Sequence, residues 1–188
     1  MGSVANLARG PHLCVIAMNP PLGEGRRTLN QVELARQVLG CTTVSIANMF
    51  AHPTKSFDEV NTVGRDVSGW ADARPSLERS LREADLLVAA WGLGGFTGQA
   101  RDHFCDQREW FLAAAAIQHS QIWSLRGEPR HPSRWHRFVA DKYERTSGGT
   151  PEERLRQVLV GTPIAEFLTS GRHLVGRMHQ IPASRSTT

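Results

Sequence analysis

Cysteine and long apolar runs are both scarce in this chain of 188 residues. The three cysteines, Cys14, Cys41 and Cys105, form no C-x-x-C pair, which argues against a zinc or iron–sulfur site and favours buried thiols. No apolar stretch reaches the roughly 18 residues of a membrane span, and the N-terminus has no signal-peptide core. We therefore expect a cytoplasmic protein without a membrane partner.

Motifs for nucleotide cofactors and for nucleophilic catalysis are also missing. The sequence contains neither G-x-x-x-x-G-K-S/T nor G-x-G-x-x-G, the two glycine-rich patterns that cradle phosphates of bound nucleotides. Nothing resembles a Ser/His/Asp or Cys/His arrangement, and the predicted strand ends carry no pair of carboxylates. We expect neither a cofactor nor a metal ion.

The composition that remains is that of one globular domain. Hydrophobic residues make up 40% of the chain and charged residues 21%, so a substantial core can form. We expect a single domain over residues 1–188, monomeric, with loose ends at 1–11 and 176–188. The formal net charge of +4 is compatible with a polyanionic partner.

Short apolar runs alternate with helical patterns along the chain. Six apolar residues at 13–18 are too few for a helix and indicate a strand buried on both faces. The alternation predicts an α/β fold with four parallel strands and helices on both faces of the sheet. Strands are expected at 13–18, 43–49, 86–91 and 121–125, helices at 28–39, 75–83 and 98–119, one or two closing helices from 151, and a long loop at 50–72.

Polar or glycine-rich residues follow each predicted strand. Asn19 precedes two prolines, Asn48 ends the second strand, glycines follow Trp91, and His131 precedes a proline. The carboxyl ends of parallel strands meet at one edge of a sheet, where ligands bind in α/β folds. The two asparagines could be simple turn residues, but an amide can also read the edge of a nucleobase. The histidine could be an ordinary loop residue or could stabilise a developing anion.

A basic segment surrounds the histidine. Its arginines are Arg126, Arg130, Arg134 and Arg137. Clustered arginines with an interleaved aromatic, here Trp135, suit phosphate contacts beside a wedge or stacking platform. The alternative is a solvated loop anchored to the core by its tryptophan.

The motifs occur in a recognisable order. Met18-Asn19-Pro20, Asn48-Met49-Phe50-Ala51, Ala90-Trp91-Gly92 and Arg130-His131-Pro132 follow one another along the chain. This series resembles a bacterial family of unknown function that carries N-P-S-x-A-D, N-L-F-A, A-W-G and H-P. The chain departs from that pattern at Pro21 and at Arg26-Arg27-Thr28, where the family has serine and an acidic segment.

The series also resembles the uracil-DNA glycosylase superfamily, which implies a three-layer α/β/α sandwich with a central four-stranded parallel sheet. By this resemblance Asn19 positions the attacking water, Asn48 reads the base, and His131 stabilises the leaving base. The loop from Ser133 to Arg137 would enter DNA, with Trp135 as the wedge. The implied substrate-binding residues are Pro20, Pro21, Glu24, Asn48, Phe50, Trp91 and Gly92. The implied DNA-binding residues are Gly94, Gly95, Arg130, Ser133, Arg134, Trp135 and Arg137.

The sequence therefore predicts a monofunctional DNA glycosylase that flips a base out of the duplex. Small residues at 21–25 and the long loop at 50–72 leave room for a bulky base. The loops also carry polar groups that could bind a sugar, namely Glu24, His52, Lys55, Asp58 and Asn61. The expected substrate is glucosylated hydroxymethylcytosine of phage DNA, removed as antiviral defence. The alternatives are repair of uracil or another deaminated base, a nucleic-acid-binding module without catalysis, and a small-molecule nucleosidase.

Overall fold

The first strand, β1 (His12–Ala17), lies inside the sheet, and all six of its residues are buried. In the computed structural model, which describes residues 10–140, 143 and 145–169, β1 pairs in parallel with two neighbours. These are β2 (Thr43–Asn48) and β3 (Leu86–Ala89), and β3 in turn pairs in parallel with β4 (Gln121–Leu125). The apolar run at 13–18 is thus the central strand that its burial pattern predicts.

A fifth strand corrects the predicted sheet. β5 (Leu159–Pro163) pairs antiparallel with β4, so the order is β2-β1-β3-β4-β5 and the sheet is mixed rather than four-stranded and parallel. Helix α7 (Pro151–Val158) ends directly before β5, where a closing helix was expected to continue. The strand can lie close to its neighbour because Gly161 faces the indole of Trp123, which would be 3.3 Å from a Cβ atom at this position.

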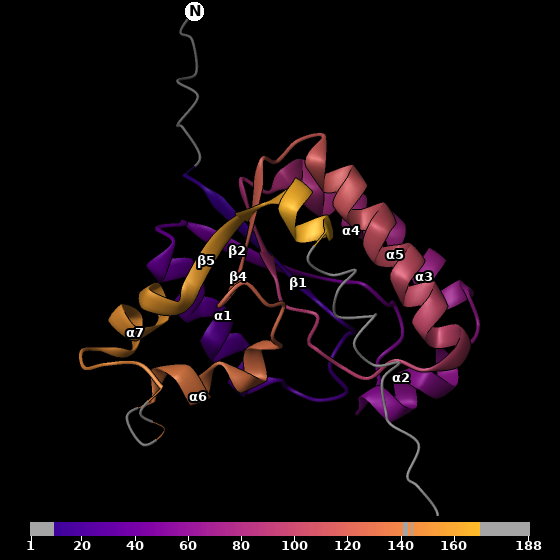
Figure 1. Cartoon of the computed structure of the whole chain (residues 1–188), viewed down its shortest axis with the longest axis horizontal. Helices are drawn as coiled ribbons and strands as arrows, with labels where there is room; N and C mark the ends of the chain where they lie inside the picture. Colours follow the sequence, from indigo (N-terminus) through magenta and orange to yellow (C-terminus); the bar gives the residue numbers. More distant parts are fainter. Residues whose placement is uncertain (1–9, 141–142, 144, 170–188) are drawn as a thin grey trace, which may run out of the picture.

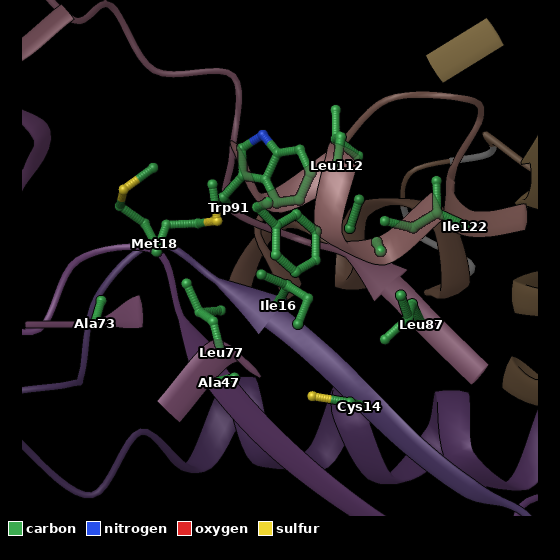
Figure 2. Close-up of a cluster of buried hydrophobic side chains, with 14 of the residues drawn as sticks. Cys14, Ile16, Met18, Ala47, Ala73, Leu77, Leu87, Trp91, Leu112 and Ile122 are labelled. Carbon is green, nitrogen blue, oxygen red and sulfur yellow. The ribbon is translucent and has the colours of Figure 1, made fainter. Parts of the chain in front are cut away.

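Helices cover both faces of the sheet, and Figure 1 shows α2–α5 on one side with α1, α6 and α7 on the other. Successive residues of β1 point to opposite faces, so Leu13 and Val15 join one core cluster while Cys14 and Ile16 join the other. The second cluster, drawn in Figure 2, contains the interior residues of α4 and α5. The labelled helices are α1 (Arg26–Val38), α2 (Phe57–Val63), α3 (Ser68–Ala71), α4 (Arg74–Glu83), α5 (Gly98–Ala116), the 3-10 turn η1 (Pro132–Arg134), α6 (His136–Val139) and α7. Residues 164–169, after β5, are helical as well, so the prediction of a second closing helix is confirmed there.

Two local predictions are wrong. Helix α1 is preceded by Gly25, whose φ of +59° suits glycine, and not by Thr28 as N-cap. The segment 50–72 is not one long loop, because it contains α2 and α3. Ser56 caps α2 by accepting a hydrogen bond from the Glu59 N–H group, a local signal that hydrophobic periodicity does not register.

The predicted loose ends lie largely outside the described residues. Within the described part, Pro11 is held in place because its carbonyl accepts a hydrogen bond of 2.8 Å from the Thr42 N–H group. None of the described helices is long and apolar enough to cross a membrane.

Candidate functional site

An open cleft of about 310 Å³ lies beyond the carboxyl ends of β3 and β4. Two segments supply most of its wall, the loop that follows β3 and the basic segment that follows β4. We call it the arginine cleft. Its lining residues are Phe57, Gly92, Leu93, Gly94, Arg130, His131, Arg134, Arg137, Phe138 and Arg145.

The arginine cleft is strongly positive. Four of its lining residues are arginines and none is a carboxylate. Arg130 forms an ion pair with Glu128, but Arg134, Arg137 and Arg145 have no carboxylate partner among the described residues. The cleft therefore favours an anionic ligand, since unpaired guanidinium groups bind phosphate well.

Phe138 packs against two arginines of the cleft and against Arg126. Its ring is buried in the core, and three guanidinium groups surround it. Their central carbons lie 5.2 Å (Arg126), 5.6 Å (Arg130) and 5.3 Å (Arg145) from the ring centre. Arg126 also donates a hydrogen bond of 2.8 Å to the Arg145 carbonyl. Cation–π attraction thus holds like charges together that would otherwise repel one another.

His131 enters the cleft in one defined state. The N–H group of Ser133 donates to its Nδ1 atom at 3.2 Å, so Nδ1 must be the acceptor and the ring proton of the neutral form lies on Nε2. The Ser133 hydroxyl lies 2.8 Å from the same Nδ1 atom. Burial, and secondarily the positive charge of Arg134, lowers the pKa of His131 below its usual value. The cleft therefore contains a neutral imidazole whose Nε2–H can donate to an anion.

The loop that follows β3 is fixed from both ends. The Gly92 N–H group donates to the Pro129 carbonyl at 2.5 Å, which joins this loop to the basic segment. The Asn61 side chain donates to the Gly95 carbonyl at 3.1 Å and accepts from the Thr97 N–H group at 3.0 Å. These two bonds give Asn61 a structural role in holding the loop.

Gly94 lets this loop pack closely. A Cβ atom there would lie only 2.1 Å from the ring of Phe57, at the start of α2. Glycine is therefore required for close packing at this position.

Asn19 lies just past β1 and is half-buried. Its Nδ2 group donates two hydrogen bonds of 3.0 Å, to the carbonyls of Pro20 and Thr54. Its Oδ1 atom has no partner among the described residues and can accept a hydrogen bond from water. Asn48 ends β2, and its buried Oδ1 atom has no hydrogen-bond partner in the described part of the chain. Neither asparagine is among the residues that line the arginine cleft.

Three aromatic residues predicted to contact a substrate or DNA are in the core instead. Trp135 is 0% exposed, and its indole N–H donates to the Arg130 carbonyl at 2.6 Å. Phe50 is 0% exposed and packs against Trp70, with 4.8 Å between the ring centres. Trp91 is buried within the cluster of Figure 2. The predictions for these side chains are wrong because their burial in the core leaves them no contact with a ligand.

Other predicted residues are not in the lining of the cleft. Pro21 and Glu24 are exposed, and Glu24 pairs with Arg26 at 2.6 Å in solvent. Sequence reasoning missed four lining residues, Phe57, Leu93, Phe138 and Arg145. Of these, a leucine between two glycines is a recognisable sign of an exposed loop tip. Within the described ranges, no three His, Cys, Asp or Glu side chains are grouped as they would be around a metal ion.

Comparison with known protein families gives one match. A family described as "Protein of unknown function (DUF1643)" matches residues 6–133, more than half of the chain. This agrees with the resemblance to a bacterial family of unknown function. The match includes His131 and ends before Arg134, so part of the arginine cleft lies beyond it. No curated protein and no solved structure matches the chain.

Proposed function

The chain belongs to the DUF1643 family, and from that premise we propose that it is a DNA glycosylase that flips a modified base into a pocket and releases it. The observation that carries this proposal is the neutral His131, which lines the arginine cleft and whose Nε2–H group has no hydrogen-bond partner among the described residues. A departing nucleobase carries negative charge, and a fixed N–H donor stabilises such a charge without a proton being lost.

The motif order supports the same proposal, because it is similar to that of the uracil-DNA glycosylase superfamily. On this interpretation the helices on both faces of the sheet form that superfamily's three-layer α/β/α sandwich, and β5 is an addition at its edge. The duplex would lie along the basic segment, where arginines contact phosphates. We propose that the protein acts as a monomer in the cytoplasm.

The reaction breaks the bond between the sugar C1′ atom and the base nitrogen. The bonding electrons leave with the base, and the Nε2–H group of His131 stabilises that charge. A water molecule then adds to C1′, loses its proton to solvent or to the released base, and leaves an abasic site. Asn19 cannot act as a general base, because an amide does not accept a proton, but its Oδ1 atom can hold the water.

For the substrate, we propose glucosylated hydroxymethylcytosine in phage DNA, with uracil as the alternative. A pocket that selects uracil needs a bulky wall to exclude larger bases. Phe57 and Phe138 line the arginine cleft, but the cleft is open, and neither Phe50 nor Trp91 closes it, because both are in the core. Residues 21–24 are also exposed. These features favour a larger base.

The test uses duplex oligonucleotides that differ in a single base: glucosylated hydroxymethylcytosine, hydroxymethylcytosine, cytosine or uracil. Alkali converts abasic sites to strand breaks, and mass spectrometry identifies the released base. The expected result is release from the glucosylated duplex by the wild type and none by His131→Gln. Release of uracil alone would refute the proposed substrate but support glycosylase activity. Binding of every duplex without release of any base would refute the glycosylase proposal.

A further inference from the structure

Leu93 is an exposed apolar side chain in an otherwise cationic cleft. Its exposed fraction is 47%, and it lies between Gly92 and Gly94 in the wall of the arginine cleft. The residue expected to enter the DNA stack, Trp135, is fully buried and cannot do so without unfolding its part of the core. The flipped base must nevertheless leave a gap in the duplex that another group fills.

The loop presents Leu93 rigidly. Gly92 has a φ of +93° and is tied to Pro129, while Asn61 bridges Gly95 and Thr97 on the other side of the leucine. These bonds hold the backbone on both sides of Leu93, so little backbone conformational entropy is lost when the loop meets DNA.

We propose that Leu93 is the wedge that fills the gap left by the flipped base. This inference rests on the proposed function. Leucine is one of the apolar residues that proteins insert between base steps, and the neighbouring Arg134 and Arg137 are placed to contact the adjoining phosphates. Leu93 would therefore act on the duplex stack, and not on the glycosidic bond.

The test compares Leu93→Ala with Ile117→Ala, a matched control at an 83% exposed aliphatic residue just past α5 and outside the cleft. Base release is measured on glucosylated duplex and on the same strand alone, which needs no flipping. Flipping is measured separately through the fluorescence of 2-aminopurine placed next to the target base.

We expect Leu93→Ala to lower base release from the duplex about tenfold, and the rise in 2-aminopurine fluorescence by the same factor. A tenfold change corresponds to about 1.4 kcal/mol, which is part of the cost of unstacking a base. Release from the single strand should be unchanged, Leu93→Met should restore duplex activity, and Ile117→Ala should behave as the wild type. Equal behaviour of Leu93→Ala and Ile117→Ala would overturn the inference. So would an equal loss of base release from the duplex and from the single strand. If the wild type releases no base, the proposed function fails. The fluorescence increase then decides the role of Leu93: its loss only in Leu93→Ala supports the wedge, and its persistence or complete absence overturns it.

Discussion

Removing one arginine from the cleft should reduce the salt dependence of DNA binding by a fixed amount. Arg134, Arg137 and Arg145 line the cleft without a carboxylate partner among the described residues, whereas Arg130 is already paired with Glu128. Each phosphate neutralised on duplex DNA contributes about −0.9 to the slope of log K against log salt, so three contacts give about −2.7. Raising the salt from about 50 to about 200 mM should then weaken binding about 40-fold for the wild type, and about 12-fold for a variant lacking one contact.

The assay is fluorescence anisotropy with a labelled duplex at four or more salt concentrations. Arg134→Gln, Arg137→Gln and Arg145→Gln are each compared with Arg79→Gln, which removes an exposed charge from α4 on the other face of the sheet. Thermal melting confirms that each variant folds. Slopes equal to that of the wild type in all three cleft variants would refute the reasoning, and so would an equal reduction in Arg79→Gln.

Three further predictions concern His131 and Trp135. His131→Gln should lower base release by about a hundredfold or more, as loss of a leaving-group donor does, while the duplex affinity measured by anisotropy stays within about twofold. Burial lowers the pKa of His131 in the folded state, so the unfolded chain takes up its proton first as the pH falls below the usual value of 6.5. The wild type should therefore lose more free energy of unfolding than His131→Gln between about pH 7.5 and about pH 5.5, as urea titrations would show; an equal loss in both would contradict the lowered pKa. Trp135→Ala should cost about 3–5 kcal/mol in the same titration, because it empties a fully buried site, and a cost below about 1 kcal/mol would mean that the indole is not in the core.

The central part of the fold follows from simple patterns. The apolar run before Asn19 predicts β1 to within a residue, because a strand buried on both faces needs continuous apolar sequence. β2 is also predicted to within a residue, although it lies at the edge of the sheet and Ala47 is its one buried residue. β5 was not predicted, because Leu159 continues the helical spacing of α7. Its backbone is extended because it pairs with β4, a contact between distant segments.

The candidate site was harder to predict than the fold. The position of His131 follows from its place after a strand, but its tautomer depends on a hydrogen bond from Ser133 that no pattern predicts. Trp135 was misjudged because composition alone does not distinguish an aromatic residue that anchors a loop from one that enters DNA. Arg145 joins the cleft only through the ring of Phe138, a contact between distant segments.

The three guanidinium groups around Phe138 also bear on how the protein responds to its solution. In the absence of a ligand their mutual repulsion opposes the folded arrangement, and sulfate or phosphate should relieve it. We expect the melting temperature to rise with these anions, and to rise less in Arg145→Gln. Amide hydrogen exchange at residues 126–140 should slow in the same conditions, since an anion that binds only the folded form suppresses local opening. The rigidity of this wall of the cleft should therefore depend on the concentration of sulfate or phosphate in solution.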